Sequence, residues 1–141
     1  MSLPRDLLKN WTILVVDDEA DSLDVARQIL QFYGANVMTA LNGEDGILLA
    51  RQQQPRFIIS DLSMPIMDGW KMIDLLKKER ATADIPVIAL TAHAMPGDRQ
   101  KAIAAGFTNY LTKPLTVSNF MNDLLALLVE IPAIAAQLKT E

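Results

Sequence analysis

The segment ILVVDD, residues 13–18, decides the fold, because a short apolar run ends directly on two carboxylates. Three further apolar runs end on a polar residue in the same way: FIISD at 57–61, VIALT at 87–91 and NYLTKP at 109–114. Short apolar runs bounded by turn signals are typical of buried strands, and their alternation with helical segments favours a parallel sheet. Ligands bind beyond the carboxyl ends of such strands, so the terminal polar residues are expected to meet at one edge.

The chain of 141 residues is predicted to fold as an α/β protein with five strand–helix units. Apolar residues at helical spacing predict the helices. The fourth helix, near 97–105, has few large apolar side chains, and the fifth is expected to start near residues 116–118 and to run to about Val129. Right-handed crossovers and five units fit a three-layer, flavodoxin-like, doubly wound fold with strand order 2-1-3-4-5. The strands are expected near residues 12–16, 36–40, 57–60, 86–90 and 108–112.

The chain divides into three predicted parts. Residues 1–10 are interpreted as an N-terminal lead-in and residues 11–130 as the domain itself. Residues 131–141 are expected to be a C-terminal helical tail or the stub of a linker, because Pro132 suits the first position of a helix. Such a tail could pack on the domain or pair with a second copy of the chain.

Composition excludes several classes of function. The formal net charge of −4, without a lysine- or arginine-rich stripe, argues against direct binding of nucleic acid. The absence of cysteine excludes disulfides and thiolate catalysis, and a single histidine, His93, excludes a multi-histidine metal site. The apolar stretches are far too short to span a membrane, and the start lacks a signal-peptide pattern.

The predicted edge of the sheet gathers three carboxylates, Asp17, Asp18 and Asp61. Two unit charges about 4 Å apart repel by roughly 4 kcal/mol at an effective dielectric constant near 20, so the group needs protons or a cation. An all-oxygen donor set suits Mg²⁺, which commonly binds carboxylates together with a phosphate. Asp61 could then be a nucleophile toward phosphorus, with Thr91 and Lys113 supplying a hydroxyl and an ammonium group to the phosphoryl oxygens.

Four segments resemble the signatures of a known family: VVDDE, SDLSMPIMDGW, ALTAHA and YLTKP. They are similar to the response-regulator receiver domain, the CheY-like phosphoacceptor domain of two-component signalling. The resemblance covers roughly residues 11–130. It implies that Asp61 is the phosphorylated aspartate, that Asp18 ligates Mg²⁺ directly, and that Asp17 helps through water. The backbone carbonyl of Ser63 would be a further metal ligand.

The resemblance also implies how the protein would switch. Thr91 would hydrogen-bond the phosphoryl group, Lys113 would pair with it, and Tyr110 would turn inward on activation. The Lys113-Pro114 peptide bond is expected to be cis. The surface of the fourth helix, fifth strand and fifth helix would then change shape.

The implied function is phosphorelay signal transduction in the cytoplasm. A phosphohistidine on a sensor histidine kinase or a histidine-phosphotransfer protein would donate its phosphoryl group to Asp61 with the help of Mg²⁺. The downstream target is unknown, and the chain could form a homodimer. The chain would not be an enzyme for external substrates, since it would assist only its own phosphorylation and dephosphorylation.

Two alternatives come from other classes of protein. A small Mg²⁺-dependent phosphatase with an aspartyl-phosphate intermediate would need a second acid two residues after the nucleophile, where this chain has Ser63, and a cap insertion. A flavin-binding electron carrier of the same fold would need a hydroxyl- and glycine-rich phosphate loop after the first strand. This chain has Asp17, Asp18 and Glu19 there, and their charge would repel a phosphate.

Overall fold

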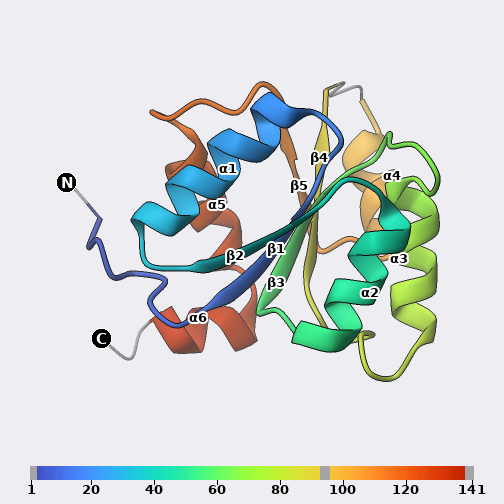
Figure 1. The fold of residues 1–141 in the computed structure, drawn as a ribbon, viewed down its shortest axis with the longest axis horizontal. Coiled ribbons are helices and arrows are strands. Elements are labelled where there is room, and N and C mark those ends of the chain that lie inside the picture. The colour runs from blue at the N-terminus through green and yellow to red at the C-terminus, as the bar shows by residue number, and fades with distance from the viewer. Residues whose placement is uncertain (1–2, 93–95, 139–141) are drawn as a thin grey trace.

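The computed structural model describes residues 3–92 and 96–138. Its centre is a parallel sheet of five strands in the order β2-β1-β3-β4-β5, which confirms the predicted doubly wound α/β fold (Figure 1). The strands are β1 Thr12–Val16, β2 Asn36–Ala40, β3 Phe57–Asp61, β4 Val87–Thr91 and β5 Asn109–Thr112. The helices are α1 Ala20–Phe32, α2 Gly43–Gln53, α3 Gly69–Lys78, α4 Asp98–Ala105, α5 Phe120–Leu128 and α6 Pro132–Leu138.

The helices cover the two faces of the sheet unequally. On one face, α1 and α5 pack over Ile13, Val15 and Ile59; on the other, α2, α3 and α4 pack over the alternate residues Leu14 and Ile58. Alternate residues of a strand point to opposite faces, so central strands covered on both sides must be apolar throughout. This double burial explains why β1 and β3 are nearly continuous apolar runs that end on aspartates.

Helix α4 is the most weakly anchored of the helices that cover the sheet, as its composition predicts. Within its span, all of which the structure describes, Ala102 is the single buried residue. Helix α5 begins at Phe120, slightly later than the predicted start near residues 116–118. Residues 117–119 form a turn instead, closed by bonds from the N–H groups of Asn119 and Phe120 to the carbonyl of Thr116.

The two ends of the described chain extend the core beyond the sheet. Leu8 is fully buried, and its N–H donates to the carbonyl of Tyr33 at the end of α1. Ile131 and Ile134 are buried in the same apolar cluster as Leu8, so α6 packs on the domain. No single helix among the described residues is long and apolar enough to cross a membrane; α5 and α6 meet that length and composition only together, with a bend of 113° between them.

Candidate functional site

The strand ends bring polar side chains from four strands to one edge of the sheet. Asp17 directly follows β1, Asp61 ends β3, Thr91 ends β4, and Lys113 directly follows β5. The parallel register aligns these ends, with Asp61 opposite Leu90 and Thr91 opposite Thr112. The edge therefore brings together Asp17, Asp61, Thr91 and Lys113, four of the residues that the sequence predicted there.

Lys113 is the centre of the site. Its ammonium nitrogen Nζ lies 3.0 Å from Asp61 Oδ2 and 3.2 Å from Asp17 Oδ2, and it also donates to Glu19 Oε1. Burial alone would lower the pKa of Lys113, but the hydrogen bonds to Glu19 and Asp61 and the charges of Asp17 and Asp61 outweigh it and raise that pKa above its ordinary value. Lys113 therefore stays protonated and balances part of the negative charge.

Asp17 is completely buried, and burial is the main reason that its pKa is raised to about 6. The N–H of Glu19 donates to Asp17 Oδ1 at 2.9 Å and lowers this pKa, whereas the charge of Asp61 raises it. Asp17 Oδ2 is buried and forms no hydrogen bond with any of the residues that the structure describes. Lys113 Nζ lies 3.2 Å from this oxygen but does not hydrogen-bond to it, so the oxygen remains available to ligate a metal ion.

The backbone after β3 holds the carboxylate of Asp61 in place. Asp61 Oδ1 accepts from the N–H groups of Leu62 at 2.7 Å and Ser63 at 3.3 Å. The loop then returns to the strand end, where the N–H of Gly69 donates to the carbonyl of Leu62. A Cβ atom on Gly69 would lie 2.3 Å from the carbonyl oxygen of Asp61, so only glycine permits this approach.

One carboxylate of the site was missed from the sequence. Carboxylate oxygens of Asp17, Glu19 and Asp61 lie within 4.8 Å of one another, which makes them a group that could hold a metal ion. Glu19 directly follows the Asp17-Asp18 pair, and this position was its only signal in the sequence. The side chain of Asp18 is exposed and lies outside this group, so its part in metal binding stays a prediction, as does that of the Ser63 carbonyl.

Thr91 and Tyr110 line one small cavity beside the carboxylates. The cavity has a volume of about 100 Å³, and its wall also includes Leu62, Trp70 and Ala102. It lies between the strand end that carries Thr91 and helix α4, so it offers room for side chains to move. The Lys113-Pro114 peptide bond is cis, as expected. His93 lies outside the described residues.

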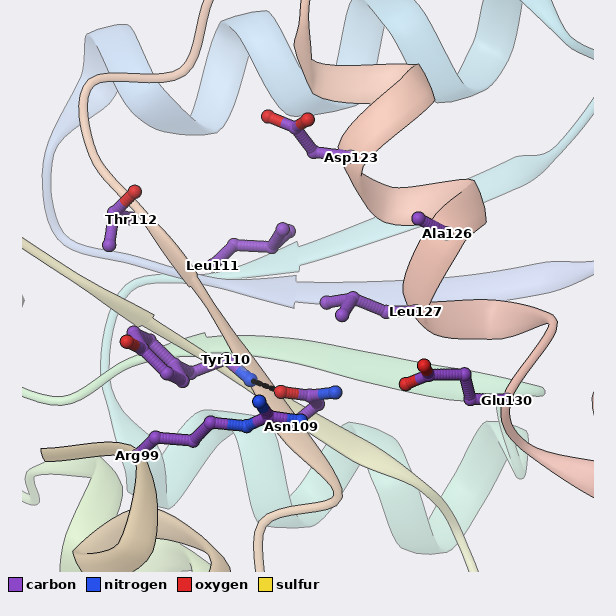
Figure 2. Close-up of a pocket in the computed structure, with 9 residues that line it drawn as sticks. All are labelled: Arg99, Asn109, Tyr110, Leu111, Thr112, Asp123, Ala126, Leu127 and Glu130. Carbon is purple, nitrogen blue, oxygen red and sulfur yellow. Dashed lines mark hydrogen bonds between the residues drawn. The ribbon is translucent and has the colours of Figure 1, made fainter. Parts of the chain in front are cut away.

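A larger cavity opens on the face formed by α4, β5 and α5 (Figure 2). Its volume is about 440 Å³. Arg99 extends into it from α4, while Asp123 and Glu130 enter from α5 and the turn after it, and the N–H of Tyr110 donates to the side chain of Asn109. Tyr110 lines both this cavity and the small one beside Thr91, so a single side chain connects the two.

Comparison with known protein families identifies the chain. A model of the response regulator receiver domain matches residues 13–125. The chain belongs to the receiver domain family. The matched residues include nearly the whole sheet and its carboxylate edge. Receiver domains act in phosphorelay signalling as phosphoacceptor switches and are generally not classed as enzymes.

Curated relatives align with most of this receiver domain. It is 34% identical to the protein PilH of Pseudomonas aeruginosa, over 82% of this chain and 96% of PilH. It is 37% identical to the DNA-binding dual master transcriptional regulator RpaA of Synechocystis, over 82% of this chain but 48% of RpaA. The chain thus spans about half the length of RpaA. The relatives give no support to the phosphatase alternative.

Solved receiver structures share the fold. The chemotaxis response regulator CheY4 of Vibrio cholerae has a TM-score of 0.78 at 28% identity, over 84% of this chain and 98% of CheY4. The receiver domain of the sensor histidine kinase PA1611 from Pseudomonas aeruginosa has a TM-score of 0.73 at 28% identity, over 82% of this chain and 95% of that domain. That structure has a magnesium ion coordinated in its active-site cleft.

Proposed function

We propose that Asp61 is the phosphoacceptor of this receiver domain. The observation that supports this assignment best is the convergence of Lys113 and the buried Asp17 on Asp61 at the carboxyl edge of the sheet. In the reaction, a carboxylate oxygen of Asp61 forms a bond to phosphorus while the bond from phosphorus to the donor histidine breaks. The imidazole nitrogen keeps the electron pair and takes up a proton from water.

The residues around Asp61 fit a Mg²⁺ ion. Asp17 offers a buried oxygen without a hydrogen-bond donor, and the burial that raises its pKa makes a further cation beside it favourable. We assign the ion to Asp17, Asp18, Asp61 and the carbonyl of Ser63, an all-oxygen set that suits a hard divalent cation. When bound, the ion supplies positive charge that offsets the charge of the phosphoryl oxygens.

Lys113 and Thr91 would receive the phosphoryl group. Lys113 already contacts Asp61 Oδ2, so its ammonium group can remain beside the new oxygen atoms with little movement. The hydroxyl of Thr91 would donate to a phosphoryl oxygen, and Tyr110 would follow it into the cavity that both line. The α4–β5–α5 face would change as Tyr110 leaves its wall, a population shift limited by how much the phosphoryl group favours the active arrangement.

The partners follow from this chemistry. The donor would be a phosphohistidine on a sensor histidine kinase or a histidine-phosphotransfer protein, and a downstream protein, still unknown, would bind the α4–β5–α5 face. Because such relays take their phosphoryl groups from cytoplasmic kinase domains, we place the protein in the cytoplasm. The chain would act on no external substrate, and its own phosphorylation and dephosphorylation would be its only reactions.

Incubation with phosphoramidate, a small phosphoryl donor, tests this proposal. Intact-mass spectrometry should detect one added phosphoryl group in the presence of Mg²⁺ and none in EDTA. Asp61→Asn should abolish the addition, whereas the matched variant Asp74→Asn, at an exposed position of α3, should keep it. Equal modification in EDTA, or an unchanged mass shift in Asp61→Asn, would refute the proposal.

A further inference from the structure

Helix α6 lines one side of an open cavity at the amino-terminal edge of the sheet, opposite to the edge that carries Asp61. The cavity has a volume of about 380 Å³, within the range of small-molecule sites. Its wall combines residues 54–56 before β3, residues from 80 to 86 before β4, and Ala133, Ile134 and Gln137 of α6. Three segments that are distant in sequence therefore line one open cavity.

Two arginines line this cavity without a carboxylate partner among the described residues. The guanidinium group of Arg56 lies over the ring of Trp11, 4.8 Å from its centre, which fixes its position. Its Nη1 atom is buried and donates no hydrogen bond within the described part of the chain. Arg80 forms no ion pair with the described residues either, and Asp84 is the one acid in the wall.

A guanidinium group without a carboxylate partner would gain charge-assisted hydrogen bonds from an anion that enters the cavity, and this gain would lower the free energy of the protein. Guanidinium groups match carboxylates and phosphates, because their N–H donors form a planar fork. The rest of the wall includes Pro55, Pro86 and Ile134, which can cover an apolar body. The charge and the apolar wall of the cavity therefore suit an organic anion.

We propose that this cavity binds a small organic anion, whose carboxylate or phosphate group is held by Arg56 and Arg80. The length of β3, five residues or roughly 16 Å, separates it from Asp61, so the ligand would not compete for the phosphorylation site. Because α6 supplies one wall, bound ligand would stabilise the packing of α6 on the domain. The site would give the protein a small-molecule input that is independent of phosphorylation.

Titration of the full chain in EDTA, followed by amide chemical shifts, tests this proposal. The probes are phenyl phosphate and benzoate, which combine an anionic group with an aromatic ring. Inorganic phosphate has the anionic group without the ring, and benzyl alcohol has the ring without a charge. Phenyl phosphate or benzoate should cause saturable shifts at residues 54–56, 80–86 and 133–137, and benzyl alcohol should not. Inorganic phosphate should bind more weakly than phenyl phosphate if the apolar wall contributes.

Variants decide whether the two arginines carry the binding. Arg56→Gln and Arg80→Gln should each weaken binding by about tenfold or more, since each removes hydrogen bonds from a charged group. Arg27→Gln, which alters an arginine of α1 that pairs with Asp24, should leave binding unchanged. Asp84→Asn should tighten binding, because it removes the acid from the wall.

Ala133→Phe provides a test that leaves both arginines intact, because the larger side chain on α6 would enter the cavity and weaken binding. It serves in place of Arg56→Gln if loss of the contact with Trp11 unfolds that variant. The proposal is overturned if neither aromatic anion causes saturable shifts at the cavity. It is equally overturned if binding survives in Arg80→Gln and Ala133→Phe, or if the shifts centre on Lys113.

Discussion

Replacing Asp17 by asparagine is expected to stabilise the metal-free protein at neutral pH. Asp17 has a pKa of about 6 in the fold against an ordinary value of 3.8, so its ionised form is disfavoured there. At about 1.36 kcal/mol for each pKa unit, this difference corresponds to about 3 kcal/mol. Asparagine resembles the protonated carboxyl group and avoids that cost.

The pH dependence follows from the sign of the shift. Below the ordinary value of 3.8, Asp17 is protonated in both states and costs nothing. Between 3.8 and about 6 the folded protein keeps a proton that the unfolded chain has released, so the free energy of unfolding falls as the pH rises. Above about pH 6 Asp17 is ionised in both states, so its burial lowers the free energy of unfolding by the full amount. Asp17→Asn should therefore raise the free energy of unfolding most in this range.

Urea unfolding in EDTA, repeated from about pH 4 to about pH 7, measures this effect. The difference in unfolding free energy between Asp17→Asn and the wild type should grow across that window. Asp74→Asn, at an exposed position, should follow the wild type throughout. Adding Mg²⁺ at neutral pH should stabilise the wild type and have much less effect on Asp17→Asn. Parallel pH curves for the wild type and Asp17→Asn would refute the reasoning.

Three further predictions concern the same edge of the sheet. Gly69→Ala should lower the free energy of unfolding by about 1–3 kcal/mol, because its Cβ would collide with the carbonyl of Asp61; thermal unfolding measures the loss. Lys113→Ala should lower the free energy of unfolding by about 3 kcal/mol at neutral pH and by less near pH 4, since the substitution leaves two buried carboxylates without their cation. Urea unfolding at both pH values measures this loss. Glu19→Gln should cost at most about 1 kcal/mol in the same assay, because the side chain of Glu19 is 61% exposed, and a loss as large as that of Lys113→Ala would contradict this account.

The sequence predicted the sheet well because its central strands are buried on both faces. Ile13 to Val16 and Phe57 to Ile59 are fully buried, and such strands must be apolar at every position. The start of α5 was predicted two to four residues too early, because a hydroxyl such as that of Thr116 is a capping signal that serves equally well in a turn. The division into lead-in, domain and tail stays a prediction.

The sequence predicted the site residues that lie at strand ends. It missed Glu19, whose side chain reaches the site from the loop after β1. Asp17, Asp61, Thr91 and Lys113 meet because parallel strands end at one edge. Glu19 joins them through its ion pair with Lys113, a contact between residues 94 positions apart that no local pattern encodes. The arginine-lined cavity was missed for the same reason, since three separate segments form its wall.

The position of the phosphoryl group tests the central claim most directly. After reaction with phosphoramidate and Mg²⁺, reduction with borohydride traps an acyl phosphate, and mass spectrometry of the peptides locates it. The account predicts a single trapped position at Asp61 in the wild type. Trapping at Asp17 or Asp18 instead, or a stable phosphoryl group on a side chain other than a carboxylate, would contradict it.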